Sequence, residues 1–371
     1  MQFIIKRDVL LKSLSFVQGV VEKKNTLPIL SNVLLELKNN KLSIVATDLD
    51  IVFYDEVEEV KILREGSTTT SATILYDILR KVPSNSELNF DLKSDNKLSL
   101  KSDNSDFNLL CLPVDNFPTF ADEFEGNGVA LNNKKFLKLL NKTKISISND
   151  DTRHYLNGVF LHLTEAHGRN FLTGVATDSH RLSSSSLEVE NVENFSSLIL
   201  PRKTVFQLST LLAETEDPLE MQTSENKVKF TLGNMKLISK VIDGKFPDYK
   251  KVVPSGNKKA LIVPSRDFIN SIERVTSVSL DRKEGVKLAI NKESIQLSVN
   301  SANSGEGNEI INAKFNSDNL NISFNAKYLI DIISEIEDKD LKMYLNNSVS
   351  PVLIEDSSDK NSYFVIMPMK I

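Results

Sequence analysis

A four-residue segment, Val-Ala-Thr-Asp, occurs twice in the chain, at residues 45–48 and again at 175–178. The residues upstream of the two copies, 26–37 and 152–163, also match in their order of apolar and polar positions. A third and more diverged copy covers 285–299. Self-similarity at a fixed period indicates that one structural unit is repeated several times along the chain. The sequence therefore predicts three similar domains.

A bulky residue followed by proline marks the end of each predicted domain. The three pairs are Phe117-Pro118, Phe246-Pro247 and Met367-Pro368. Polar stretches at 123–127 and 254–259 follow the first two pairs and are typical of linkers. We therefore expect boundaries near residues 125 and 255, which gives domains of 1–125, 126–255 and 256–371.

Each predicted domain opens with a short strand and an amphipathic helix, and strands with alternating polarity follow, as at 32–37 and 41–46. A second helix is expected at 74–79, 205–208 and 328–333. This order predicts an α+β fold, with helices on one face of antiparallel sheets. The apolar positions of the three opening helices are Val9, Leu10, Leu14, Val17 and Val21, then Phe136, Leu137 and Leu140, then Phe268, Ile269, Ile272 and Val275.

The composition is that of an ordinary globular protein. Of the 371 residues, 40% are hydrophobic and 26% are charged. No apolar run approaches the roughly 18 residues that a transmembrane helix needs, and the first residues lack the pattern of an export signal. A single cysteine, Cys111, cannot form an internal disulfide, which favours a reducing cytoplasm.

The charge is distributed unevenly between the predicted helices and the rest of the chain. Residues 131–145 contain five lysines and no acidic residue, and the six predicted helical segments together carry a net charge of +10. Because the whole chain has a net charge of −5, the remainder must carry −15. The sixth segment, 325–337, is an exception with a net charge of −2.

Two interpretations of this pattern remain open. Lysines on surface helices are commonly only solvated, and any one helix is explained in that way. If the fold gathers the helices on one side, they form a surface that attracts phosphates without reading bases. Such a surface would suit sequence-independent binding of duplex DNA.

Five segments, taken in order along the chain, resemble the bacterial DNA polymerase III β subunit family, the replicative sliding clamps. The resemblance implies a head-to-tail homodimer, with six similar domains around a hole that holds duplex DNA. It implies that helices line the hole, that sheets form the outer wall, and that no catalysis and no cofactor are involved. Short peptides of the replicative polymerase, the clamp loader and repair polymerases would bind a cleft between the second and third domains. The segments are 26–30, 155–158, 176–182, 243–249 and 365–371.

The resemblance also implies roles for individual residues. It assigns to the peptide-binding cleft Leu156, Thr177, Ser179, His180, Arg181, Leu182, Pro247, Lys251, Val252, Val365, Met367, Pro368 and Met369. Ser179 stands where many relatives have glycine, and Lys251 stands where arginine is common. The two methionines suit a site that accepts several peptides, because their side chains are flexible and polarisable. Without the resemblance, 367–369 would be interpreted as a closing strand of the core.

Two further sets of residues follow from the resemblance and the charge pattern. The expected DNA-facing residues are Lys24, Lys134, Lys135, Lys138, Arg153, Tyr155, Arg202 and Lys203. Asp150 stands on the same path and would repel phosphate. Ring closure is expected to bring Phe107 and Leu109 of one chain against Ser277 and Val278 of the other.

The two alternative functional classes are an enzyme and a protein-binding repeat scaffold. An enzyme would need converging catalytic groups, and Asp178, Ser179 and His180 are adjacent in sequence, which does not produce a triad. The sequence contains no phosphate-binding glycine loop, zinc-protease motif or cysteine cluster. A repeat scaffold that binds proteins but not nucleic acid is the second alternative.

Overall fold

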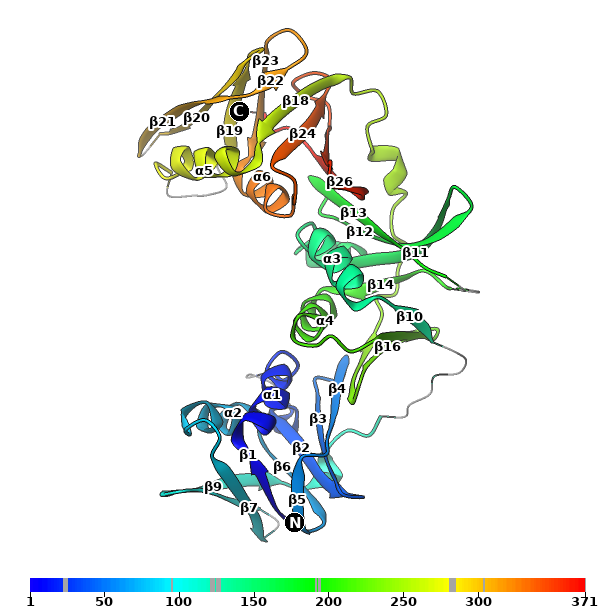
Figure 1. Cartoon of the computed structure of the whole chain (residues 1–371), viewed down its shortest axis with the longest axis vertical. Coiled ribbons are helices and arrows are strands. Elements are labelled where there is room, and N and C mark those ends of the chain that lie inside the picture. Colours follow the sequence, from blue (N-terminus) through cyan, green and yellow to red (C-terminus); the bar gives the residue numbers. More distant parts are fainter. Residues whose placement is uncertain are drawn as a thin grey trace. The chain divides into compact units, whose positions relative to one another are not determined.

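The computed structural model describes residues 1–22, 26–94, 96–120, 124, 128–190, 192, 195–279, 285–302 and 304–370. The chain forms two compact units. Unit 1 combines Met1–Lys134 with Lys203–Val241, and unit 2 combines Lys135–Arg202 with Ile242–Ile371. Figure 1 shows the helices and strands of both units.

Unit 1 is built on one 13-stranded sheet with the order β10-β15-β16-β17-β4-β3-β2-β6-β9-β8-β7-β1-β5. Three helices accompany it: α1 (Arg7–Val17), α2 (Ala72–Lys81) and most of α4 (Arg202–Glu214). The first nine strands are β1 (Gln2–Lys6), β2 (Asn32–Lys38), β3 (Lys41–Thr47), β4 (Ile51–Val57), β5 (Val60–Arg64), β6 (Gly66–Ser71), β7 (Glu87–Ser94), β8 (Lys97–Ser102) and β9 (Ser105–Leu112). The others are β10 (Val129–Leu131), β15 (Leu219–Thr223), β16 (Lys227–Leu232) and β17 (Met235–Lys240).

The pairing of β4 with β17 makes this sheet continuous between the first repeat and part of the second. The register is antiparallel and aligns Ile51 with Ser239 and Asp55 with Met235. Helix α1 packs against α2, and its residues Leu10, Leu14 and Val17 are buried. The pattern predicted an apolar face reaching Val21, but α1 ends at Val17. Gly19 follows, where an added Cβ would lie only 1.8 Å from the amide oxygen of Gln207.

Unit 2 contains two sheets and the helices α3 (Asn133–Lys144, from residue 135 on), α5 (Ser265–Thr276) and α6 (Ala326–Ile333). The nine-stranded sheet has the order β14-β11-β12-β13-β26-β25-β24-β18-β22, and the four-stranded sheet has the order β21-β20-β19-β23. The strands of the first sheet are β11 (Gly158–Ala166), β12 (Arg169–Thr177), β13 (Arg181–Glu188), β14 (Leu198–Pro201), β18 (Lys259–Pro264), β22 (Lys314–Phe315), β24 (Asp340–Leu345), β25 (Val352–Asp356) and β26 (Asp359–Ile366). The strands of the second are β19 (Gly285–Ile290), β20 (Ser294–Ser301), β21 (Gly305–Asn312) and β23 (Leu320–Asn325).

The α+β prediction is confirmed. A strand followed by a helix recurs as β1–α1, β10–α3 and β18–α5, and the second helices are α2, α4 and α6. In α5, the predicted apolar face is buried at Phe268, Ile272 and Val275. The domain boundaries near 125 and 255 remain a prediction, and residues 121–123 and 125–127 lie outside the described part of the chain.

Among the described residues, no helix is both long enough and apolar enough to cross a bilayer. Cys111 on β9 is a buried free thiol, and burial raises its pKa.

Candidate binding surfaces

An apolar cluster in unit 2 brings together three residues of the predicted peptide cleft. Leu156, Leu182 and Val365 are buried in one cluster, although more than 200 positions separate the first from the last. Leu182 and Val365 face each other across the β13–β26 pair. Phe246 of the same cluster stacks on Phe160, with ring centroids 4.9 Å apart.

The repeated Val-Ala-Thr-Asp segment ends in a tight turn beside this cluster. Asp178 Oδ1 accepts the backbone N–H groups of His180 and Arg181, both at 2.9 Å, and Thr177 Oγ1 donates to Arg181 O at 2.7 Å. Ser179 has a φ of 76°. A left-handed backbone costs a residue with a Cβ about 1–2 kcal/mol, so these hydrogen bonds hold a strained turn.

Arg181 is buried and its guanidinium is held from three sides. It donates to Asp178 Oδ2 at 3.1 Å and to Asp331 Oδ2 on α6 at 2.7 Å. Its Cζ lies 4.2 Å from the ring centroid of Tyr328. These contacts join the turn to α6, so Arg181 serves the packing of the chain itself.

The remaining predicted cleft residues lie at the surface. Met367 is 37% exposed, Met369 is 36% exposed, and Pro247 and Val252 are also exposed. The Met367 N–H donates to His180 O at 2.8 Å, which places the C-terminal segment beside the turn. Lys251 forms an exposed ion pair with Asp248 at 3.3 Å, and Pro368 is half-buried.

Arg153 and Tyr155, both predicted to face DNA, lie near the same turn. Arg153 Nη1 donates to Ser179 Oγ at 2.6 Å, and its Nε donates to Asp150 Oδ2 at 2.9 Å. Asp150 also receives hydrogen bonds from Thr152, which together with Arg153 lower the pKa of its carboxyl. Asp150 therefore neutralises Arg153, a role that the sequence did not indicate. Tyr155 is half-buried and packs on the apolar cluster.

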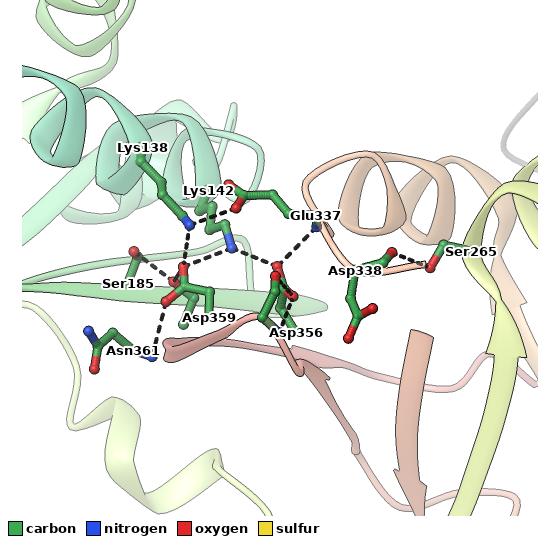
Figure 2. A network of polar contacts seen from close by, with 11 residues as sticks. Lys138, Lys142, Ser185, Ser265, Glu337, Asp338, Asp356, Asp359 and Asn361 are labelled. Atoms are coloured by element: carbon green, nitrogen blue, oxygen red, sulfur yellow. Dashed lines mark hydrogen bonds and ion pairs between the residues drawn. The ribbon is translucent and has the colours of Figure 1, made fainter. Parts of the chain in front are cut away.

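Lysines of α3 meet carboxylates from the last third of the chain (Figure 2). Lys142 Nζ lies 3.0 Å from Asp356 Oδ2 and 2.9 Å from Asp359 Oδ2. Lys138 Nζ lies 2.8 Å from Glu337 Oε2 and 3.2 Å from Asp359 Oδ2. The helix that appeared as a uniformly cationic face in the sequence is thus partly neutralised inside the protein.

These ion pairs explain why the sixth predicted helical segment carries a net negative charge, unlike the other five. Asp331 on α6 pairs with Arg181, and Glu337 just beyond α6 pairs with Lys138. Burial raises the pKa of Glu335, while Lys144 and Lys142 oppose that shift by their positive charge. The acids of this segment therefore face cations of the same unit.

The other predicted DNA-facing cations differ in their surroundings. Lys203 lies 2.5 Å from Asp48 Oδ2 and donates to Val20 O at 2.8 Å. Lys134 forms a fully exposed pair with Glu216 at 2.8 Å, Lys135 is exposed, and Arg202 is half-buried. Lys24 lies outside the described residues.

Two hollowed surfaces contain residues of the predicted self-association site. In unit 1, a cavity of about 470 Å³ is lined by Ile74 and Ile78 of α2 and by Phe107. In unit 2, a cavity of about 660 Å³ is lined by Ser277, Ile330 and other residues of α5 and α6.

The strands beside these cavities present open edges and exposed apolar side chains. In the described chain, β21 pairs with β20 alone, and β9 meets β6 only at Cys111 and Leu112. Leu109 is buried in its own unit, whereas its neighbour Leu110 is 81% exposed. Val278 is half-buried against the core. Ile74, Leu110 and Ile310 are exposed apolar residues that sequence reasoning missed; the alternation along β9 was the signal for Leu110.

The described residues contain no group of three or more histidine, cysteine or acidic side chains that could hold a metal ion. In the turn, Asp178 binds Arg181 and the backbone, and Ser179 binds Arg153. Nothing in this geometry places a base next to a nucleophile.

Comparison with known proteins decides the family. Models of the N-terminal, central and C-terminal domains of the DNA polymerase III beta subunit match residues 1–121, 130–248 and 250–370. The chain belongs to the DNA polymerase III beta subunit family. It is 35% identical to the beta sliding clamp of Caulobacter vibrioides and 32% identical to that of Escherichia coli K12, with 100% of both chains covered in each case.

Solved structures agree over the same length. A crystal structure of the sliding clamp of Bartonella birtlesii bound to griselimycin is 37% identical, has a TM-score of 0.95, and is covered completely by this chain. A sliding clamp structure from Pseudomonas aeruginosa, also bound to griselimycin, is 31% identical with a TM-score of 0.91 and the same coverage. The family consists of non-catalytic processivity factors, so the sliding-clamp expectation is confirmed. The alternative of a scaffold that does not bind nucleic acid has no support.

Proposed function

We propose that two copies of this chain close head to tail into a ring around duplex DNA and tether the replicative polymerase in the cytoplasm. The observation that carries this proposal is the match of three successive clamp domains over the whole chain. A head-to-tail interface closes when its rotation divides a full turn. Three similar domains in each of two chains supply six such steps.

The ring separates two requirements that conflict in an ordinary DNA-binding protein. Contacts with phosphates are independent of sequence and weak at physiological salt, so they let a protein slide. A polymerase also needs a tether that does not dissociate. A closed ring meets both needs because escape requires the opening of an interface, whatever the strength of the local contacts.

For ring closure, we propose that the hollowed surface around Phe107 meets the one around Ser277. Phe107 and Leu109 remain the proposed contacts on the first side, and Ser277 and Val278 those on the second. The exposed Ile74, Leu110 and Ile310 add apolar area that would be buried on association. On its β6 side, β9 pairs only at Cys111 and Leu112, and among the described residues β21 pairs with β20 alone, so both strands offer backbone groups that another strand could pair with.

For partner binding, we propose that an apolar peptide lies on the surface around Leu156, Leu182 and Val365. We call this the peptide surface and include in it the other residues assigned to the cleft from sequence. Met367 and Met369 would adapt to different anchors. Because Arg181 is already held by two carboxylates, we propose that it shapes this surface and does not bind the peptide directly.

For DNA, we propose that Lys134 contributes more than Lys138, Arg153 or Lys203, and that the exposed Lys135 belongs to the same DNA-facing set. The pair of Lys134 with Glu216 is fully exposed, and such pairs are worth little and exchange easily. The other three cations hold partners that are less exposed. Lys24, Tyr155 and Arg202 complete the proposed set.

Retention on circular DNA tests the ring. Native mass spectrometry should give two chains per particle, and clamps loaded on a nicked circular plasmid should co-elute with it in gel filtration. Cutting the plasmid once should release them, because only the topology has changed. The single-chain mass, or equal retention before and after the cut, would contradict the proposal.

A further inference from the structure

Five charged side chains from three separate segments of unit 2 form one network (Figure 2). Lys138 and Lys142 come from α3, Glu337 follows α6, and Asp356 and Asp359 flank the turn between β25 and β26. The two lysines share Asp359 Oδ2, at 3.2 and 2.9 Å. We call these residues the α3 network.

The centre of the α3 network is removed from water. The side chain of Lys142 is 1% exposed, and that of Asp356 is 0% exposed. Burial of ions costs several kcal/mol per group, so a buried ion pair is weak evidence for stability compared with apolar residues of the same volume. Such a pair does demand particular geometry, because any shift leaves a buried charge without its partner.

The contacts of Lys142 require one particular position of the turn between β25 and β26. Asp356 Oδ2, besides binding Lys142, accepts the backbone N–H of Glu337 at 3.0 Å. Asp356 Oδ1 accepts the N–H of Ser358 at 3.0 Å inside the turn. The β25–β26 register is irregular at this place. The α3 network therefore fixes a turn whose strand pairing alone is not regular.

A further link leads from the network to the neighbouring strand. Ser362 Oγ lies 2.9 Å from Asp359 Oδ2 and 2.8 Å from Ser185 Oγ, and the two serines face each other across β26 and β13. Along the same pair, Val365 faces Leu182 and Ile366 faces Arg181. At about 3.3 Å per residue, Ser362 and Ile366 are roughly 13 Å apart. The network thus holds one end of β26, and the peptide surface lies at its other end.

Register matters here because successive side chains of a strand point to opposite faces. A slip of one residue would turn Val365 out of the apolar cluster and bring a neighbour in its place. It would also displace Met367, whose N–H is bound to His180 O at 2.8 Å.

We propose that Lys142 is a positioning residue of the peptide surface: by binding Asp356 and Asp359 it fixes the start of β26, and thereby the places of Val365 and Met367. This inference rests on the proposed peptide-binding function of that surface. Lys142 touches no peptide itself.

Two variants separate positioning from simple stability. Lys142→Met leaves the buried Asp356 without a cation and Asp359 with Lys138 as its one cation, and it should lower the melting temperature strongly. The triple variant Lys142→Met, Asp356→Asn, Asp359→Asn removes the charges together and should recover most of that loss. Calorimetry with a synthetic peptide from the C-terminal tail of the replicative polymerase should still show about tenfold weaker binding to the triple variant. Wild-type affinity in the triple variant would overturn the proposal.

A second variant keeps the test decisive if the triple variant does not fold. Ser362→Ala cuts the link to Ser185 without leaving a buried charge, and peptide binding should weaken by about threefold; unchanged binding would again overturn the proposal. Lys41→Met, which breaks an exposed pair with Glu56 and Glu58 in unit 1, is the matched control. If the wild-type protein itself fails to bind the peptide, the peptide-binding function is wrong. If the wild-type protein binds the peptide and the variants bind it equally well, only the proposed role of Lys142 is wrong.

Discussion

The two Val-Ala-Thr-Asp turns have the same backbone and carry different side chains. In unit 1, Thr47 Oγ1 donates to Ile51 O at 2.8 Å, and in unit 2 Thr177 Oγ1 donates to Arg181 O at 2.7 Å. The residue after the aspartate has a positive φ in both turns, 81° at Leu49 and 76° at Ser179. Four identical residues thus give one turn geometry twice.

The chain that lies beside each turn also follows the same path. The N–H of Lys240 donates to Asp50 O at 2.9 Å, and the N–H of Met367 donates to His180 O at 2.8 Å. In unit 1 the side chains at these two positions form an ion pair of 2.9 Å between Lys240 and Asp50. In unit 2 they are methionine and histidine.

This difference explains why only one of the two turns is proposed to bind peptides. An ion pair beside the first turn offers charged groups, which an apolar anchor would have to desolvate. The second turn offers a polarisable thioether and an imidazole next to a buried apolar cluster. We propose that the repeated backbone supplies the same turn twice and that the side chains at these two positions determine which turn binds a peptide.

The largest expected effect comes from transferring the ion pair to the second turn. The double variant His180→Asp, Met367→Lys should bind the polymerase-tail peptide about a hundredfold more weakly, because an apolar contact becomes a charged pair. Calorimetry measures the affinity. The reciprocal variant Asp50→His, Lys240→Met in unit 1 should keep wild-type affinity at the original site. Unchanged binding by the transferred pair would show that these positions do not distinguish the turns.

An intermediate effect is expected from acid. The Glu337 amide, Ser358 and Lys142 outweigh the opposing effect of burial and lower the pKa of Asp356 to about 2, and Lys142, Ser362 and Lys138 likewise lower that of Asp359. The stability these groups contribute is complete above the unfolded pKa near 3.8 and is lost as the pH falls towards 2. For Asp356 this amounts to about 2 kcal/mol.

Unit 1 should respond to acid in the opposite direction at its own buried carboxyl. Asp55 accepts a hydrogen bond from Ser13 at 2.5 Å, and burial raises its pKa, so protonation relieves an unfavourable charge. Hydrogen exchange between pH 5 and pH 2.5 should therefore show lost protection in β25 and β26 before β3 and β4. Simultaneous loss in both pairs would contradict this order.

The smallest effect concerns the strained residue of each turn. Glycine adopts a positive φ without steric strain, so replacing Leu49 or Ser179 by glycine relieves the backbone strain of the turn. Both replacements raise the conformational entropy of the unfolded chain to the same extent. Ser179→Gly also removes the hydrogen bond from Arg153, so Leu49→Gly should be the more favourable change by about 1 kcal/mol. Thermal unfolding of both variants measures the difference. Equal shifts in melting temperature would mean that the bond to Arg153 contributes nothing.

Much of the fold could be predicted because it depends on local periodicity. The α5 face of Phe268, Ile272 and Val275 and the strands near 32–37 and 41–46 appear as expected. The end of α1 was misplaced because the apolar positions continue to Val21, whereas the helix ends at Val17, two residues before Gly19. The partners of Lys138 and Lys142 were missed because they lie 199 to 221 positions away.

The sequence by itself determined the repeats, the order of strands and helices, the family and a list of candidate residues. Hydrophobic spacing and the repeated turn sequence are local, and both can be recognised without coordinates. Only the tertiary structure decided which charges remain at the surface. Charge counting treated α3 as a cationic face, whereas packing places Lys142 between two aspartates and Arg181 between Asp178 and Asp331. Electrostatic partners are chosen by distance in space, and separation along the chain does not reveal that distance.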